Sequence, residues 1–239
     1  MNKKLSELSI FFPFWNEAEN IEDVVKKAIP VAEKVADKWE IIMVDDGSSD
    51  RTLEIAEKLA KNDKRLRVIT HQPNRGYGAA LTSGFTGASY KYIVFADGDD
   101  QFDFSEITKF VETIDNADMV IGYRQKRRDH KLFKRLLLMN LLKVWDFILF
   151  HFYFRDIDCG FKMFKKEALD KIMPFRSEGA MITTEILAKA RRKKLKIKEV
   201  GVTHYPRKLG HQSGANFPVI VRAILESFIL WYDLHYGRA

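Results

Sequence analysis

The sequence predicts an α/β protein whose mixed, mostly parallel sheet is flanked by helices. In the first half, short apolar runs alternate with longer amphipathic segments, an order typical of β-α-β units. The chain has 239 residues, 46% of them hydrophobic, which suits one domain with a sizeable core. We divide it into residues 1–130, residues 131–215 and a C-terminal amphipathic segment of residues 216–239.

The expected elements follow one another without a linker or an internal repeat. Ser49 or Asp50 is the expected N-cap of the second helix, with Glu54 near its start. The expected order is strand 8–14, helix 18–36, strand 40–44, helix 50–61, strand 66–70, helix 78–89 and strand 92–95, with a later strand at 118–121.

Residues 95–103 (FADGDDQFD) place several carboxylates at the end of an apolar run. Asp97 and Asp99 form an Asp-x-Asp pair, a spacing that lets alternate side chains of a tight turn converge on one ion. Oxygen ligands of this kind suit hard cations such as Mg²⁺ and Mn²⁺. A lone Asp-x-Asp is more often a solvated loop, so the prediction depends on the neighbouring strands.

Two further predicted strands also end in polar side chains. Asp45 and Asp46 follow strand 40–44, and Asn16 and Glu17 follow strand 8–14. Ligands of open α/β sheets bind outside the carboxyl ends of the strands. Three such ends predict one common site.

Residues 74–80 (NRGYGAA) follow the third strand and open a helix. With the next glycine at Gly84, they complete neither a P-loop nor a dinucleotide fingerprint. Two interpretations stay open: a loop that binds phosphate, or small residues that let the helix approach the sheet closely.

The charge balance and two apolar segments bear on partners. A net charge of +7 favours an anionic partner, whether phosphate, a lipid surface or nucleic acid. The single cysteine, Cys159, excludes an internal disulfide and suits a reducing cytoplasm. No signal peptide or membrane-spanning run is expected. Residues 132–154 and 217–236 instead mix apolar, aromatic and basic residues, which is compatible with helices lying in a membrane interface and with helices packed on the sheet or on another subunit.

Four motifs together resemble those of family 2 glycosyltransferases with a GT-A fold: residues 12–17 (FPFWNE), 44–50 (VDDGSSD), 74–78 (NRGYG) and 97–103 (DGDDQFD). The chain is most similar to the dolichyl-phosphate mannose synthase branch, whose members transfer a sugar from a nucleotide to a polyprenyl phosphate. The similarity covers nearly the whole chain and implies that residues 1–130 bind the nucleotide-sugar and the metal, whereas residues 131–215 bind the acceptor. Its lipid acceptor favours the membrane interface for residues 132–154 and 217–236. Trp15, where the family commonly has tyrosine, and Gly98, where alanine is frequent, depart from the pattern without changing a ligand.

The resemblance implies roles for the motif residues. Asp97, Asp99 and Gln101 match the positions that hold Mg²⁺ or Mn²⁺, with Asp99 and Gln101 as direct ligands, and Asp45 and Asp46 face base and ribose. The residues implied to bind the nucleotide-sugar are Pro13, Asn16, Glu17, Asp45, Asp46, Gly76, Asp97 and Gly98.

The resemblance also assigns arginines to the phosphates. Arg124 and Arg135 are implied to hold the acceptor phosphate, and Arg207 to reach the donor diphosphate or the acceptor phosphate. A guanidinium gives planar, bidentate donors to phosphate oxygens. Asp158 is implied to contact the sugar, whereas Cys159 is expected to pack.

Glu185 corresponds to a region where polysaccharide synthases of the wider family carry a general base, and its role here stays open. An acceptor phosphate, with a second pKa near 6, is largely dianionic at neutral pH and needs no base. The catalytic residues implied are Asp99, Arg124, Arg207 and Glu185.

The implied reaction is inverting, metal-dependent transfer of a hexose, mannose or glucose, from a GDP- or UDP-sugar to dolichyl or undecaprenyl phosphate at the cytoplasmic membrane face. A homo-oligomer is compatible with the sequence. One alternative is a soluble family 2 transferase acting on a saccharide or protein, with Glu185 or Asp158 as base. A nucleotide-binding scaffold without turnover is a second. Nucleic acid is not expected as a partner, since only the charge balance favours it.

Overall fold

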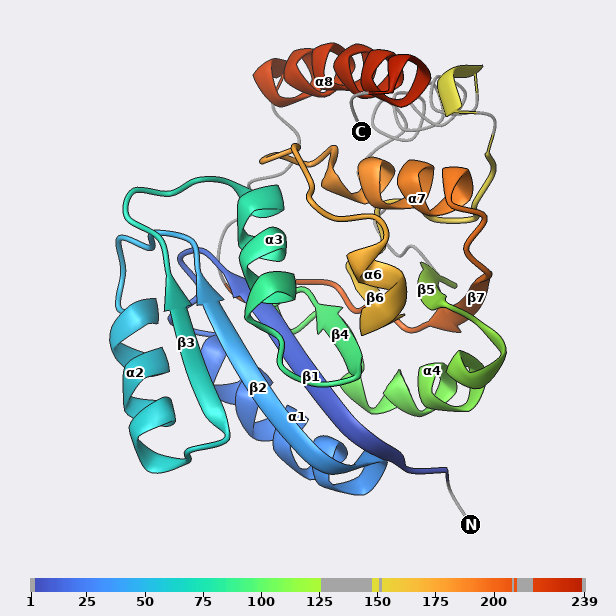
Figure 1. Cartoon of the computed structure of the whole chain (residues 1–239). Coiled ribbons are helices and arrows are strands. Elements are labelled where there is room, and N and C mark those ends of the chain that lie inside the picture. Colours follow the sequence, from blue (N-terminus) through green and yellow to red (C-terminus); the bar gives the residue numbers. More distant parts are fainter. Residues whose placement is uncertain (1–2, 126–147, 151, 208, 210–216, 238–239) are drawn as a thin grey trace.

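A computed structural model describes residues 3–125, 148–150, 152–207, 209 and 217–237, and side chains of the last segment from residue 224. One sheet lies at the centre, with helices on both faces and α8 (Phe217–Tyr236) above α7 (Ile182–Arg192) (Figure 1). The α/β prediction is confirmed. Among the described residues, no helix is both long and apolar enough to cross a membrane.

The sheet has seven strands in the order β3-β2-β1-β4-β6-β5-β7. Strand β1 pairs in parallel with β2 and β4, β2 with β3, and β5 with β7. Strand β6 runs antiparallel to both β4 and β5, which makes the sheet mixed. The strands are β1 (Leu5–Phe14), β2 (Ala36–Asp45), β3 (Leu66–Thr70), β4 (Tyr92–Ala96), β5 (Met119–Arg124), β6 (Phe161–Lys165) and β7 (Ile197–Val202).

Two hydrophobic clusters, one on each face, hold the helices to the sheet. Phe12 and Phe14 of β1 belong to the cluster formed with α1, α2 and α4, whereas Phe11 belongs to the cluster formed with α3, α6, α7 and α8. Side chains alternate along a strand, and a parallel strand is buried on both faces. The remaining helices are α1 (Ile21–Val35), α2 (Thr52–Asn62), α3 (Tyr77–Gly87), α4 (Ile107–Thr113) and α6 (Lys166–Asp170).

Most expected elements are present, with shifted ends. Strand 66–70 has the expected bounds, whereas β2 begins at Ala36 because it pairs with the start of β1, Leu5 opposite Ala36. The N-cap prediction was wrong by one or two residues. Arg51 precedes α2, although the Asp50 carboxylate accepts the Thr52 N–H at 2.9 Å.

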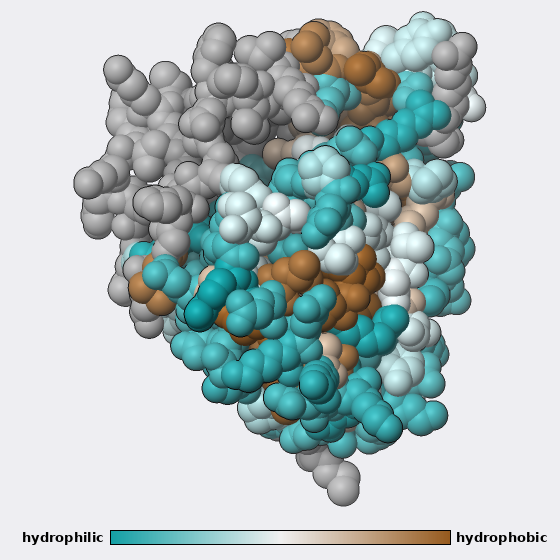
Figure 2. All heavy atoms as spheres, turned by 90° about the vertical axis from the view of Figure 1, so that its left-hand side faces the viewer, coloured by the Kyte–Doolittle hydropathy of each residue, from teal (hydrophilic) through white to brown (hydrophobic). Residues whose placement is uncertain are grey.

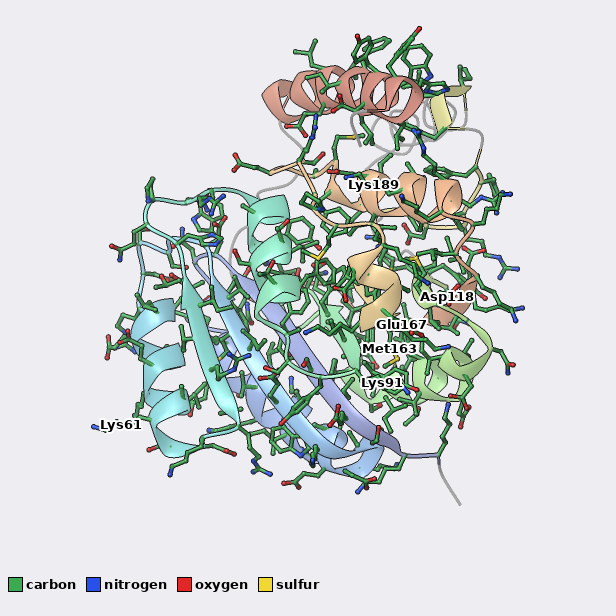
Figure 3. The ribbon with its side chains drawn as sticks, viewed as in Figure 1. Lys61, Lys91, Asp118, Met163, Glu167 and Lys189 are labelled. Atoms are coloured by element: carbon green, nitrogen blue, oxygen red, sulfur yellow. The ribbon has the colours of Figure 1, made fainter. Side chains whose placement is uncertain are left out.

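Hydrophilic residues cover much of the face seen in Figure 2, and hydrophobic residues are visible at its middle and at its top. Lys61 points outward from α2 (Figure 3). Hydrophobic atoms gather at the top of the molecule, where α8 lies (Figure 2). The expected helix over residues 217–236 matches α8, while the other predicted interfacial segment lies mostly outside the described residues.

Candidate active site at the carboxyl ends of the strands

A cavity of about 370 Å³ opens at the carboxyl ends of β1, β2 and β4. It brings together eight of the sequence-predicted residues: Pro13, Glu17, Asp46, Gly76, Asp97, Gly98, Asp99 and Arg207. The cavity therefore lies outside the carboxyl ends of the strands, where ligands of open α/β sheets bind. Its other lining residues are Phe14, Trp15, Asn74, Tyr77, Ala80, Gly179 and Ala180.

Asp97 follows β4 and is held by two hydrogen bonds. Its N–H donates to the Gly160 carbonyl at 3.0 Å, and its Oδ1 accepts the Tyr77 hydroxyl at 2.7 Å. A Cβ on Gly160 would lie 2.0 Å from Oδ2 of Asp97, so only glycine leaves room for this carboxylate. Burial and the nearby charge of Asp99 raise the pKa of Asp97 to about 7.

Asp99 lies on the same wall. Its Oδ1 accepts the Gln101 N–H at 3.2 Å, and its Oδ2 lies 3.6 Å from Nη1 of Arg207. Burial raises the pKa of the Asp99 carboxyl, and the Gln101 N–H and the Arg207 charge oppose that rise. Arg207 also forms an ion pair with Glu17. The pKa of Glu17 is raised by burial, with hydrogen bonds from Asn20 and Arg207 acting in the other direction.

The paired carboxylates fit a divalent cation that arrives with a phosphate ligand. Both have raised pKa values mainly because burial disfavours the charged carboxylates, and a bound cation would favour the charged forms. Among the described residues, no group of three His, Cys, Asp or Glu side chains is arranged to hold an ion. Mg²⁺ sites with one or two carboxylates usually complete their shell with substrate phosphates and water.

Gln101 is not among the residues that line the cavity. Its amide nitrogen donates to the Tyr205 carbonyl at 2.8 Å, which leaves its side-chain oxygen as an acceptor. The contact joins the Asp-x-Asp loop to the segment that carries Arg207.

Asp46 organises the neighbouring loop. Its carboxylate accepts from His71 Nδ1 at 2.6 Å, Asn74 Nδ2 at 2.8 Å and the N–H groups of Arg75 and Gly76 at 3.0 and 2.8 Å. Gly76 has φ +104°, a conformation that favours glycine. Asp46 thus shapes the cavity by holding residues 74–76.

Asp45 lies deeper and does not line the cavity. Its Oδ2 accepts from the Thr70 hydroxyl at 3.2 Å, but its buried Oδ1 has no hydrogen-bond partner in the described part of the chain. A buried carboxylate oxygen without a partner is costly, and the N–H of a nucleotide base is one donor that suits it.

Asn16 also lies outside the cavity and joins two loops. Its Oδ1 accepts the Ser49 N–H at 2.7 Å, and its own N–H donates to Ser48 Oγ at 2.9 Å. Asn16 has φ +54°, a left-handed conformation that asparagine tolerates.

Arg124 is engaged by a carboxylate outside the cavity. Its Nε and Nη2 donate to the two Asp156 oxygens at 2.6 and 2.8 Å. Burial lowers the pKa of Arg124, but these bonds outweigh burial and the net shift is upward. Arg135 lies outside the described residues, and Asp158 is exposed, whereas Cys159 is fully buried as expected.

Three contributors to the site were not predicted: Tyr77, His71 and Lys162. Lys162 is fully buried, and its Nζ donates to the Ile157 carbonyl at 3.0 Å and to the Cys159 carbonyl. These bonds fix the turn that supplies Gly160 behind Asp97. Tyr77 lies within the motif of residues 74–78, and Lys162 follows closely after Asp158 and Cys159, whereas His71 carries no signal except its position after β3.

The N-terminus of α3 is covered by protein. The N–H groups of Gly78 and Ala79 donate to the Glu178 carbonyl at 2.7 and 3.3 Å. A Cβ on Gly84 would lie 2.3 Å from the Phe11 ring. Of the two open interpretations of these glycines, close packing is the one that the geometry favours.

Known proteins with similar folds are GT-A glycosyltransferases. Glucosyl-3-phosphoglycerate synthase from Mycobacterium tuberculosis, solved with Mn²⁺, UDP and glucosyl-3-phosphoglycerate, matches with a TM-score of 0.67 and 19% identity, over 95% of this chain and 80% of that one. At this identity the likeness shows the fold alone. The family model for glycosyl transferase family 2 matches residues 9–173. The chain therefore belongs to glycosyl transferase family 2.

Two curated relatives cover most of the chain. The dolichyl-phosphate beta-glucosyltransferase of Saccharomyces cerevisiae is 33% identical over 82% of this chain. The dodecaprenyl-phosphate galacturonate synthase of Rhizobium johnstonii is 26% identical over 97% of this chain. This chain spans 66% of the yeast protein and 70% of the Rhizobium protein.

Proposed function

We propose that the protein transfers a hexose, with inversion, from a nucleotide-diphosphate sugar to a polyprenyl phosphate, with Mg²⁺ or Mn²⁺. The observation that carries the proposal is the cavity in which Asp97, Asp99 and Arg207 meet. Carboxylates for a metal-bound diphosphate and a guanidinium for its oxygens are the groups that such a donor requires.

The relatives support the acceptor more strongly than the sugar. One is named for dolichyl phosphate and glucose, the other for dodecaprenyl phosphate and galacturonate. The prenyl phosphate is common to both names, whereas the sugar differs. Glucose and mannose are the first sugars to test, each carried on GDP or UDP.

The residues act by positioning and by charge. The acceptor phosphate oxygen forms a bond to C1 of the sugar as the bond from C1 to the donor diphosphate breaks, and the electron pair leaves with the nucleoside diphosphate. Arg207, beside Asp99, is placed to stabilise that developing charge. A bound divalent cation would add Lewis-acid stabilisation of the same diphosphate.

We also propose that α8 contacts the cytoplasmic face of a membrane. Its outer side exposes Leu225, Phe228, Tyr232 and Tyr236, while Leu230 and Leu234 are buried. An apolar helix face with aromatic residues suits a membrane interface, and a lipid acceptor requires access to one.

The test measures release of nucleoside diphosphate from a panel of GDP- and UDP-sugars with Mg²⁺ or Mn²⁺, with and without a short polyprenyl phosphate. Release that requires both the lipid phosphate and the metal supports the proposal and identifies the donor. Release that requires only a water-soluble saccharide would overturn the acceptor assignment. Binding of nucleotide-sugar without turnover under every condition would instead indicate a scaffold.

Asp99→Ala is the control for the site. It should abolish transfer while the circular-dichroism spectrum and melting temperature stay close to those of the unchanged protein. Retained metal-dependent transfer would contradict the metal assignment.

A further inference from the structure

We propose that Glu185 is a positioning residue that holds residues 176–180 as a wall of the donor cavity. The proposal deepens the proposed function and rests on it for the identity of the ligand. It assigns Glu185 a role other than that of a general base.

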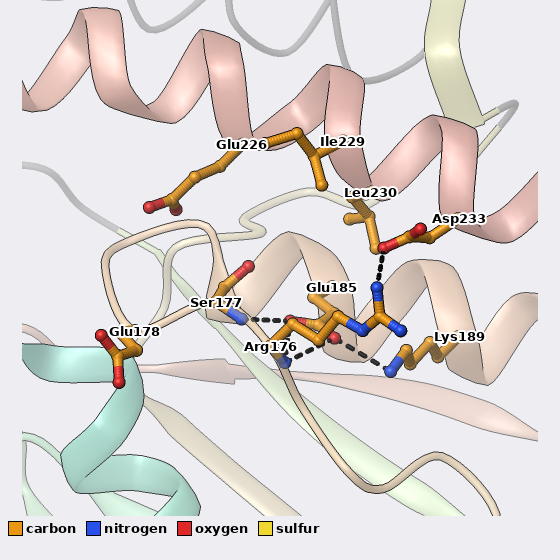
Figure 4. Close-up of a pocket in the computed structure, with 9 residues that line it drawn as sticks. All are labelled: Arg176, Ser177, Glu178, Glu185, Lys189, Glu226, Ile229, Leu230 and Asp233. Carbon is orange, nitrogen blue, oxygen red and sulfur yellow. Dashed lines mark hydrogen bonds and ion pairs between the residues drawn. The ribbon is translucent and has the colours of Figure 1, made fainter. Parts of the chain in front are cut away.

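Glu185 lies on α7, buried, and its carboxylate is already engaged by protein. Its oxygens accept the N–H groups of Arg176, at 3.0 and 3.1 Å, and of Ser177, at 2.8 Å. The Lys189 ammonium, one turn further on, lies 2.9 Å from Oε1 and donates to the Pro174 carbonyl at 2.6 Å. Figure 4 shows these bonds converging on Glu185. Glu185 and Lys189 together therefore hold the backbone on both sides of Phe175 by hydrogen bonds.

The segment of residues 176–180 extends to the donor cavity. The Glu178 carbonyl accepts the N–H groups of Gly78 and Ala79 at the start of α3. The next two residues, Gly179 and Ala180, line the donor cavity together with Tyr77. Glu185 does not line that cavity. It lines a separate cavity of about 190 Å³ between the segment and α8.

The packing leaves this segment little freedom to shift. A Cβ on Gly78 would lie 2.1 Å from the Ser177 carbonyl oxygen, and one on Gly76 would lie 2.5 Å from that of Glu178. Gly76 and Gly78 therefore pack directly against the backbone of this segment, which leaves no room for a side chain at either position. Loss of the carboxylate leaves two part-buried N–H groups without their charged acceptor, so the segment should detach from α3 and open the cavity wall.

A general base and a positioning residue predict different kinetics. Glu185→Ala should raise the KM for the nucleotide-sugar by tenfold or more, about the effect of losing one charge-assisted hydrogen bond. Glu185→Gln keeps an acceptor oxygen and should recover most of the donor affinity. A base would give the reverse result: both variants lose kcat while donor affinity stays unchanged.

A second measurement is independent of turnover. Hydrogen exchange of the Gly78 and Ala79 amides, followed in peptides covering residues 77–81, should become about tenfold faster in Glu185→Ala without any ligand. The matched control is Glu178→Gln. The exposed Glu178 carboxylate forms an ion pair with Arg75 at 3.3 Å, and the amides of this variant should exchange at the same rate as those of the unchanged protein.

The outcomes separate the two proposals. Faster exchange at residues 78 and 79 with no transfer activity in any variant upholds the positioning role and rejects the proposed reaction. Unchanged exchange together with unchanged nucleotide affinity in Glu185→Ala overturns the positioning role, whatever the reaction proves to be.

Discussion

The guanidinium of Arg207 lies 3.6 Å from the carboxylate of Asp99. The two residues are far apart in the sequence, one in the loop after β4 and the other in the segment after β7. Arg207 also pairs with Glu17. In the protein without nucleotide, Arg207 therefore neutralises part of the negative charge that a divalent cation would meet.

Arg207→Ala should have opposite effects on metal and on turnover. Mn²⁺ should bind the nucleotide-free variant more tightly, because a competing cation has been removed from Asp99. Transfer should fall by about 10² to 10³ in kcat/KM, the range seen when one group that stabilises a transition state is deleted. Mn²⁺ titration by electron paramagnetic resonance and nucleoside diphosphate release measure the two effects.

Arg207→Lys is the matched control, since it keeps the charge without the planar pair of donors. It should leave Mn²⁺ affinity near that of the unchanged protein and recover only part of the turnover. Weaker Mn²⁺ binding in Arg207→Ala would contradict the competition between the two cations.

The pH dependence of metal binding should follow Asp97. Its pKa is raised to about 7 by burial and by Asp99, so the proton must leave before an ion is bound. Mn²⁺ affinity should be constant above about pH 7 and fall by about tenfold per pH unit below it. Mn²⁺ titrations on either side of that pH measure the slope.

The same shift sets the direction for stability. A carboxyl whose pKa is raised on folding stabilises the folded state most at pH values below its unfolded pKa of 3.8, and that contribution is lost as the pH rises through about 7. Asp97→Asn should remove this contribution from the melting curves of the metal-free protein. An Asp97→Asn variant with the same pH dependence of Mn²⁺ binding as the unchanged protein would reject Asp97 as the titrating group.

Gly160→Ala should displace the Asp97 carboxylate from its position in the site. The added Cβ would lie 2.0 Å from an Asp97 oxygen, so the carboxylate or the turn must move. Such overpacking costs about 1–3 kcal/mol of stability, and Mn²⁺ affinity should fall with it. Thermal unfolding and Mn²⁺ titration measure both effects.

The control for stability is Gly179→Ala, whose Cβ would meet only the flexible Glu226 side chain at 3.6 Å. It should unfold at nearly the same temperature as the unchanged protein. This prediction would be wrong if Gly160→Ala and the unchanged protein had equal unfolding temperatures and equal Mn²⁺ affinities. The turn at residue 160 would then accommodate the added methyl group without loss of stability.

Local pattern was enough to predict most of the sheet and the carboxylates of the site. Apolar runs that end in polar residues are short-range signals, and β3 matches its predicted bounds because its five residues are bounded by polar loops. The antiparallel β6 was not predicted, since its direction depends on its partners β4 and β5 and not on its own residues.

The partners of individual side chains could not be read from the sequence. The bond from Arg124 to Asp156 and the grip of Glu185 on residues 176 and 177 depend on contacts between separate elements. A motif identifies the residue type at a position, but hydrogen bonds across the fold decide whether that side chain faces a cavity or supports a loop.

The outer face of α8 should bind lipid. Leu225 and Phe228 are 59% and 47% exposed, and replacing both with serine removes apolar area that an interface would bury. Co-sedimentation of Leu225→Ser/Phe228→Ser with vesicles of anionic phospholipid should fall by at least about tenfold, with a nearly unchanged melting temperature because both side chains are largely exposed. Leu230→Ser is the contrasting control. Leu230 is buried against the domain, so its replacement should lower the melting temperature instead. Equal vesicle binding by the double variant and the unchanged protein would exclude this face as the membrane contact.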